Sequence, residues 1–328
     1  MRRGAAALTL CAAACAAPGQ GTVEAQDRHR SERIAEELAR RGHHDLARDQ
    51  RAALARETED ELRRGEQLIE RCDLLRDERK TDPARRCYLG LVQEVLPEQK
   101  AEARYRAATM EVELGRITKA RERLREMIID QPNTEAAETG ARYLLELAGE
   151  SGERSSEAQH LLDALLPQAK FDDKTRALCT YLLLSTGSKS PETLARAWAL
   201  GSDTHWRDEL YLARGKAHLE RGELAAATEV FEAFLADRQT SWFVGSYDSP
   251  YLGESAMLLG GAYEALEQRD DAIRIYRWLV DELPKSKYRD DAAFRSARLT
   301  GTRAALEEFV RTYPDSRHIP AAKEELGP

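Results

Sequence analysis

The sequence is poor in aromatic residues, proline and cysteine. Its 328 residues include 6 Phe, 11 Tyr and 4 Trp, together with 11 Pro, 20 Gly and 5 Cys. A compact globular domain usually builds its core on large aromatic side chains, so this composition argues against one large core. The glycine content excludes a collagen-like fibre, and we find no convincing strand pattern, which argues against a β-sandwich.

Long apolar runs and an excess of positive charge are also missing. No apolar run of membrane-spanning length follows residue 17, which argues against a polytopic membrane protein. The formal net charge is −8, which argues against a general nucleic-acid binder and favours basic or neutral partners.

The chain carries no motif that points to a chemical reaction. It has no G-x-x-x-x-G-K-[ST] loop, no G-x-G-x-x-G after a strand, no H-E-x-x-H and no nucleophile elbow. The seven histidines are scattered, and the adjacent His43 and His44 lie on a predicted turn where their side chains diverge. We therefore expect neither an enzyme nor a bound metal or cofactor.

What the sequence does contain favours helices. Hydrophobic residues make up 42% and charged residues 33% of the chain, and Ala, Leu, Glu and Arg are abundant. These residues have high helix propensity, and alanine allows helices to pack closely.

A repeat of helical hairpins explains this composition. The clearest unit spans residues 253–286 and has small and aromatic residues at regular spacing: Leu259, Gly260, Tyr263, Ala272, Tyr276 and Pro284. Small residues let two antiparallel helices approach, aromatic rings fill the gaps between successive hairpins, and Pro284 ends the second helix.

The same pattern recurs along the chain. Units are predicted at 208–241, 101–134, 60–98, 135–168 and 172–202, and Ala305, Phe309 and Pro314 mark a last, shortened one. In three hairpins a turn glycine precedes the key alanine by five residues, at Gly42, Gly115 and Gly222. We predict an all-α fold: a right-handed superhelical solenoid of about eight antiparallel hairpins, several of them degenerate.

This pattern resembles that of tetratricopeptide-repeat (TPR) proteins over residues 31–326. Within 250–326 the segments SPYLGESAMLLGGAYEAL, DAIRIYRWLVDELPKSKYRDDA and ALEEFVRTYPDSRHIPAA are similar to periplasmic TPR lipoproteins of the BamD/CpoB type. The resemblance implies a non-catalytic scaffold whose concave groove binds envelope proteins or peptides, supporting envelope assembly or an envelope-spanning machine. The alternatives are an accessory subunit of a cell-wall or secretion enzyme, and a cytosolic TPR adaptor.

The N-terminus is predicted to be a processing signal. A basic start at residues 1–3 precedes an apolar stretch at 4–17, and the tripeptide before Cys15 resembles a bacterial lipobox. We predict a signal peptide over 1–14, lipidation at Cys15, a flexible tether over 15–30 and the solenoid over 31–328. This places the protein at the outer membrane, facing the periplasm. Lipidation at Cys11, and an ordinary secretory signal cut near Ala17 that leaves a soluble periplasmic protein, are the alternatives.

Of the three remaining cysteines, two are predicted to lie in one hairpin and the third in the hydrophobic core. Cys72 and Cys87 fall on the two helices predicted within 60–98, where close packing would bring them within bonding range. We predict a Cys72–Cys87 disulfide, and the alternative is two buried thiols. Cys179 lies in an apolar segment and is predicted to be a core residue.

Two segments interrupt the repeat. An aromatic insertion at 239–250 carries Trp242, Phe243 and Tyr247, with Tyr251 just beyond it. These rings either form a partner-binding lip or fill the groove between hairpins. The segment 185–191 is either a hinge or a loop within a hairpin, and we favour the loop.

The repeat phase also suggests contact positions for a partner on the first helices. They are Tyr211, Arg214 and His218 in one hairpin and Ala256 and Tyr263 in the next, with His218 also expected to serve in packing.

Overall fold

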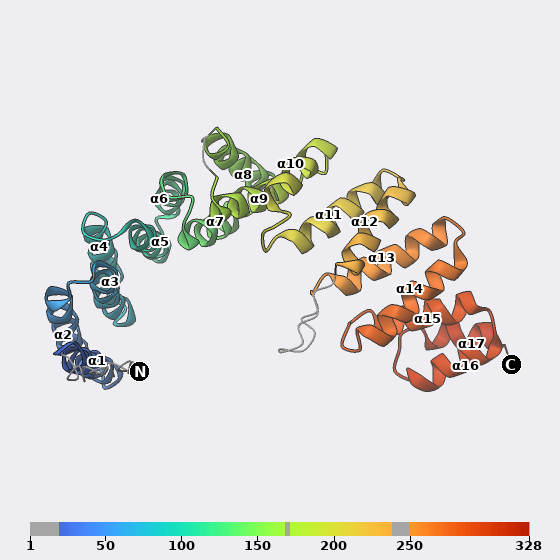
Figure 1. The fold of residues 1–328 in the computed structure, drawn as a ribbon, viewed down its shortest axis with the longest axis horizontal. Coiled ribbons are helices and arrows are strands. Elements are labelled where there is room, and N and C mark those ends of the chain that lie inside the picture. Colours follow the sequence, from blue (N-terminus) through green and yellow to red (C-terminus); the bar gives the residue numbers. More distant parts are fainter. Residues whose placement is uncertain (1–19, 168–170, 238–248, 328) are drawn as a thin grey trace, which may run out of the picture. The chain divides into compact units, whose positions relative to one another are not determined.

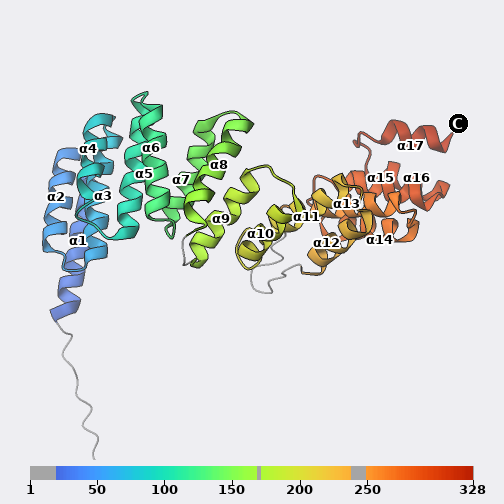
Figure 2. The same ribbon diagram turned by 90° about the horizontal axis from the view of Figure 1, so that it is seen from above.

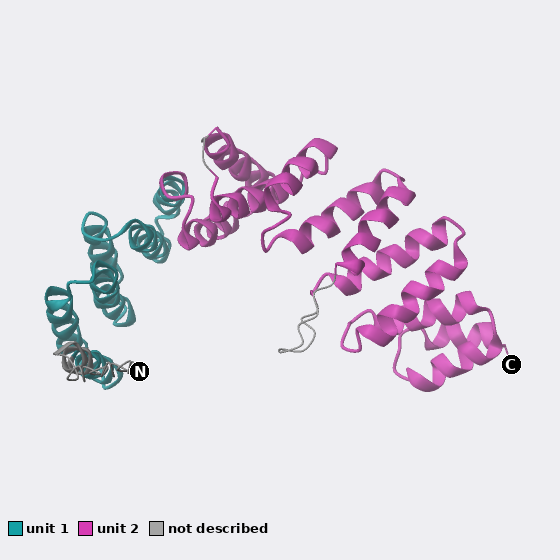
Figure 3. Cartoon of the chain, in the orientation of Figure 1, with its two compact units in different colours: residues 1–127 teal, residues 128–328 magenta. Residues whose placement is uncertain are grey.

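The computed structural model describes residues 20–167, 171–237 and 249–327, and this part of the chain folds into 17 helices without a strand (Figure 1). The all-α solenoid of helical hairpins predicted from the sequence is confirmed. The chain divides into two compact units, Met1–Met127 and Ile128–Pro328 (Figure 3). We describe each unit by itself.

Unit 1 contains the first helices in chain order, lying side by side in sequence order (Figure 2). Their bounds are α1 Gln20–Arg40, α2 His44–Glu57, α3 Glu61–Asp77, α4 Thr81–Leu91 and α5 Pro97–Glu113, and the unit ends within α6 Ile117–Asp130. Each helix from α1 to α5 packs on its neighbours in the chain, and α3 also contacts α5. The first helices of consecutive hairpins therefore meet.

Unit 2 repeats this arrangement. Its helices are α7 Glu135–Ala148, α8 Ser151–Leu165, α9 Asp173–Ser185, α10 Pro191–Gly201, α11 Arg207–Glu220, α12 Leu224–Ala236, α13 Leu252–Ala265, α14 Arg269–Glu282, α15 Arg289–Thr300, α16 Arg303–Thr312 and α17 Ile319–Leu326. The first helices α7 and α9 contact each other, as do α11 and α13. The repeated units predicted at 208–241 and 253–286 correspond to the pairs α11–α12 and α13–α14.

The helices of a hairpin are held together by an aromatic ring lying on a glycine. A Cβ added to Gly260 would lie 2.4 Å from Cε1 of Tyr276, and one added to Gly215 would lie 2.3 Å from Cζ of Phe231. Both rings are completely buried. The ring thus packs against the glycine of its own hairpin, which corrects the expectation that these aromatics chiefly fill gaps between successive hairpins.

The turn inside the hairpins is the same in five cases. Gly115 and Gly222 adopt φ of +73° and +74°, the left-handed region in which a side chain is strained. Gly42 does the same, and in α3–α4 and α13–α14 the equivalent residues are Arg79 and Glu267, each with φ of +60°. In every case the next residue donates its backbone N–H to the carbonyl five residues earlier, which closes the end of the first helix.

Buried tyrosines also connect consecutive hairpins through carboxylates. In unit 1 the Tyr88 hydroxyl donates to Asp73, which Arg106 of the next hairpin also binds. In unit 2 Tyr276 donates to Glu264, which Arg295 of the next hairpin binds at 3.0 Å. Burial and the hydrogen bond to a carboxylate both raise the pKa of the Tyr88 and Tyr276 phenols, so both rings stay neutral donors.

Of two expectations about segment boundaries, the tether over residues 20–30 differs in the structure and the loop over 185–191 agrees with it. Residues 20–30, predicted to belong to a flexible tether, form the start of α1. They are polar, but they contain good helix formers and no glycine or proline after Gly21, so polarity alone was a poor guide. The segment 185–191 joins α9 to α10 within one hairpin, and the division between the two units falls at 127–128 instead.

The cysteines lie where two of them can bond. Cys72 on α3 and Cys87 on α4 form a disulfide with a Cα–Cα distance of 5.6 Å. Cys179 is buried as a free thiol, and burial raises its pKa to about 12, so it is unreactive at neutral pH.

Replacing Gly260 by alanine should destabilise the protein by about 1–3 kcal/mol, because the new Cβ overlaps the Tyr276 ring. The matched control is Gly261→Ala in the same helix, where the nearest atom lies 3.7 Å away. It should be neutral or stabilise by up to about 1 kcal/mol, since alanine favours helix. Urea unfolding followed by circular dichroism compares the two, and equal midpoints would contradict this packing.

The Cys72–Cys87 bond should persist in the purified protein. With Cys11 and Cys15 replaced by serine, thiol titration of the denatured, unreduced chain should detect Cys179 alone, and all three cysteines after reduction. Reduction should cost about 3 kcal/mol of stability for a loop of this length. A Cys72→Ala/Cys87→Ala variant should be insensitive to reductant. Three free thiols before reduction would refute the disulfide.

Candidate partner-binding surface

The first helices of unit 2 carry a cluster of aromatic rings around one arginine. Arg142 on α7 places its guanidinium carbon 5.1 Å from the ring centre of Tyr181 on α9. The same carbon lies 4.8 Å from the ring centre of Trp206, the residue before α11. The two rings are stacked on each other with their centres 5.2 Å apart. Three successive hairpins thus contribute to one cluster, which we call the aromatic cluster.

Carboxylates surround this cluster. Oε1 of Glu138 accepts a hydrogen bond from Arg142 at 2.9 Å, and Nε2 of His205 lies 3.2 Å from the same oxygen. The Tyr251 hydroxyl donates to Glu209 at 2.7 Å. Burial first, and then this hydrogen bond, raises the pKa of Tyr251 to about 12, while the positive charge of Arg142 opposes the rise.

The local charge is negative. The carboxylates that raise the pKa of Tyr181 or Tyr251 come from both flanking helices and include Glu138, Glu146, Asp208 and Glu209. Arg142 is the cation that opposes them in both cases. The Arg142 side chain is 48% exposed and that of His205 is 58% exposed, so these two groups form the open edge of the cluster, whereas the Trp206 ring beneath them is buried. Arg142 already lies against both rings, so what the cluster offers a partner is this edge with its carboxylates, which suit a cationic side chain.

Trp206 has an unused donor within this cluster. The side chain is 7% exposed, and its Nε1 has no hydrogen-bond partner among the described residues. Buried indole N–H groups usually find an acceptor, so this position marks the cluster as unusual.

Sequence reasoning did not find Arg142, Tyr181 and Trp206. They lie on three different hairpins, and no local pattern links them. The one available signal was the rarity of tryptophan and tyrosine in this chain.

The predicted contact residues of α11 and α13 divide into buried and partly exposed groups. Tyr211 is 8% exposed, with its ring stacked on Phe234 and edge-on to Trp198. Tyr263 is 7% exposed, and Ala256 is completely buried. This corrects their assignment as partner contacts, because their surfaces are already used in packing. The periodicity placed them on the first helices but could not show how deeply those helices are covered.

The other two contact candidates keep some exposed surface. Arg214 lies with its guanidinium carbon 4.4 Å from the ring centre of Trp198. Nδ1 of His218 lies 2.7 Å from Oε2 of Glu223, which Arg221 also binds. His218 therefore secures the turn between α11 and α12, in line with its expected packing role.

Several predicted site residues lie outside the described residues. These are Cys15 at the predicted lipidation site and Trp242, Phe243 and Tyr247 of the aromatic insertion. Tyr251, at the edge of that insertion, is described and joins the carboxylates around the aromatic cluster through Glu209.

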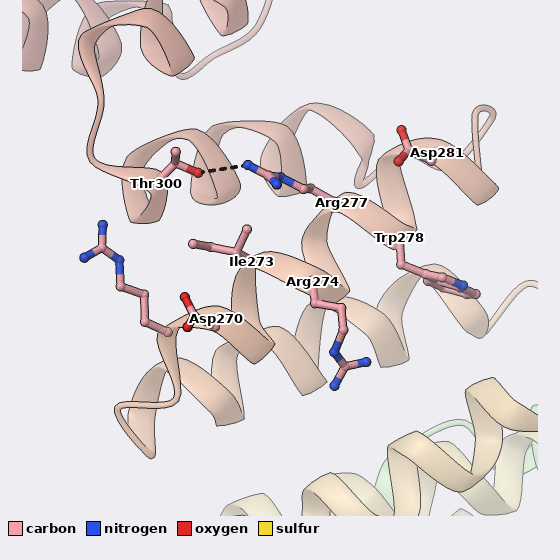
Figure 4. Close-up of a pocket in the computed structure, with 8 residues that line it drawn as sticks. Asp270, Ile273, Arg274, Arg277, Trp278, Asp281 and Thr300 are labelled. Carbon is pink, nitrogen blue, oxygen red and sulfur yellow. Dashed lines mark hydrogen bonds between the residues drawn. The ribbon is translucent and has the colours of Figure 1, made fainter.

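A separate groove of about 680 Å³ runs along α14, on a second helix of a hairpin (Figure 4). Its arginines are already engaged by the protein. Arg274 binds Asp271 at 3.0 Å, and Arg277 donates to Thr300 at the end of α15. Figure 4 shows Arg277 reaching across to Thr300, with Trp278 and Asp281 toward the other end of the groove. These paired charges make this groove a weaker candidate than the aromatic cluster.

Within residues 20–167, 171–237 and 249–327, no three His, Cys, Asp or Glu side chains are grouped so that they could hold a metal ion. None of the helices in the described part combines the length and the apolarity needed to cross a membrane.

Comparison with solved structures finds helical-repeat proteins at low sequence identity. No family model matches the chain, and no curated protein matches it. Solved structures that it matches include the C-terminal part of a TPR protein from Cytophaga hutchinsonii, at 14% identity and a TM-score of 0.46, over 77% of this chain and 98% of that one. A STAND signal-transduction ATPase with a TPR sensor from Pyrococcus horikoshii matches at 14% identity and a TM-score of 0.49, over 94% of this chain and 49% of that one.

A third match is the APC/C hetero-tetramer Cut9–Hcn1, at 15% identity and a TM-score of 0.41, over 89% of this chain and 54% of that one. The chain thus spans about half the length of the second and third of these structures. The repeated antiparallel hairpins, with glycine–aromatic contacts at Gly215 and Gly260, by themselves define the described part of the chain as an all-α solenoid of TPR-like hairpins.

Proposed function

We propose that this protein is a non-catalytic scaffold that binds a protein partner along the first helices of its hairpins. The observation that carries the proposal is the aromatic cluster, in which three hairpins bring Arg142, Tyr181 and Trp206 together and leave Arg142 and His205 exposed at its edge. The carboxylates beside that edge suit an arginine or lysine side chain of an extended peptide. The net charge of −8 favours the same kind of partner.

We further propose that the protein is a lipid-anchored component of a bacterial outer membrane, facing the periplasm and similar in role to TPR lipoproteins of the BamD/CpoB type. The sequence of residues 1–17 and the resemblance over 250–326 support this proposal. The proximity of Cys72 and Cys87 also supports it, because disulfides persist in oxidising compartments. Its partners would be other envelope proteins or peptides.

Site-specific crosslinking tests the scaffold. A photo-crosslinking residue at His205 should capture an envelope protein saturably, whereas the same residue at Glu229, exposed on the second helix α12, should not. Adding Glu138→Lys to the protein that carries the crosslinker at His205 should weaken capture at least fivefold, because it removes a carboxylate and repels a basic partner. Unsaturable capture, or equal capture from both positions, would refute binding at the aromatic cluster.

Mass spectrometry of the mature N-terminus tests the anchor. The mature chain should begin at Cys15 and carry acyl groups. A chain that begins after Ala17 without acyl groups would instead establish a soluble periplasmic protein. Full-length chain in the cytosol would overturn the envelope assignment altogether.

A further inference from the structure

The first hairpin leaves an apolar surface uncovered. Ile34 on α1 is 45% exposed and Leu46 on α2 is 57% exposed, and they are two of only four large apolar side chains exposed in the described part of the chain. In the following hairpins of unit 1, the first helix packs against the second helix of the hairpin before it, as α3 does against α2. No described helix precedes α1, so no described residue covers its outer face in this way.

Basic groups surround this surface. A groove of about 870 Å³ is lined by Ile34, Leu38 and Leu46 and is bordered by Arg30 and Arg33. Arg40 and Arg41 also border it, and both bind Glu37. Arg30 and Arg33 have no carboxylate partner among the described residues and are exposed.

The lining of this groove is opposite in charge to the whole chain. It contains four arginines and two glutamates, Glu36 and Glu37, although the chain as a whole carries −8. A partner protein of basic character, as proposed for the aromatic cluster, would be repelled here. An anionic surface is the complement of exposed arginines interleaved with aliphatic side chains.

We propose that this basic and apolar face of α1 and α2 lies on an anionic phospholipid surface. The choice of a membrane as the surface that this face contacts rests on the lipid anchor proposed above. Gln20, where α1 begins, is five residue steps from Cys15, a separation of at most about 18 Å. Ile34 lies 14 residues further along α1, about 21 Å by helical rise, so a helix lying along the leaflet brings it to the lipid.

The physical role of this contact is orientation. An acyl anchor holds one point of the chain but leaves its direction free, whereas a second contact on the same helix fixes the direction. Apolar side chains inserted at the headgroup level and arginines near anionic lipid add to the binding supplied by acyl chains.

The test uses the mature chain with Cys15→Ser, so that acylation cannot supply the binding. This protein should float with vesicles of phosphatidylethanolamine and phosphatidylglycerol and not with vesicles of phosphatidylcholine. Raised salt should weaken the binding. Arg30→Gln/Arg33→Gln should lower the partition coefficient about 25-fold, since each arginine near the surface contributes roughly fivefold. Ile34→Ser/Leu46→Ser should lower it as well.

The matched control is Arg154→Gln/Arg196→Gln, which removes two exposed arginines from α8 and α10 and should leave vesicle binding unchanged. Circular dichroism should show equal helicity in all variants. Absence of flotation with phosphatidylglycerol, equal flotation with phosphatidylcholine, or equal loss in the control would overturn the proposal. A dimer in sedimentation velocity that Ile34→Ser/Leu46→Ser dissociates would overturn it too, by assigning the face to a second copy.

The vesicle experiment and the mass spectrometry test different proposals, so either proposal can be refuted without the other. Mass spectrometry decides whether Cys15 is acylated in the cell, and flotation of the unacylated chain decides whether this face binds anionic lipid.

Discussion

The contact between a glycine on one helix and an aromatic ring on the next is the constraint on which this structure depends. At Gly260 and Gly215 the ring of Tyr276 or Phe231 occupies the space that a side chain would take. This brings the two helices of a hairpin close together without a large central core. The low aromatic content is consistent with this packing, because in these two hairpins a single buried ring fills the space between the helices.

The glycine–aromatic contact holds together the two helices of one hairpin. Consecutive hairpins are held to each other in part by hydrogen bonds and ion pairs. Asp73 and Glu264 each bind a tyrosine from their own hairpin and an arginine from the next one. Because such contacts lie on the first helices, they leave a face that is rich in charged groups and only partly covered. The aromatic cluster belongs to this face in unit 2. The same packing rule leaves the outer side of α1 uncovered, since no described helix lies before it.

Several features could be predicted because they depend on residues close together in the sequence. The turn glycines Gly115 and Gly222 were identifiable by their spacing from the following alanine. The same turn at Arg79 and Glu267 was not, because those residue types carry no signal for a positive φ. The start of α1 was misjudged for a related reason, since a polar segment can be either a tether or a solvated helix.

The sequence by itself determined the helical class, the hairpin period and the positions of the repeated glycines and aromatics, because these follow from helix geometry over about 34 residues, as in 253–286. That each ring packs on the glycine of its own hairpin was decided by the tertiary structure. Only the tertiary structure decided which first-helix residues are buried and which are open. The positions of Tyr211 and Tyr263 within the repeat suggest surface residues, yet both are buried in the structure. Arg142, Tyr181 and Trp206 meet only because α7, α9 and α11 are stacked, and contacts between separate repeats leave no periodic trace in the sequence.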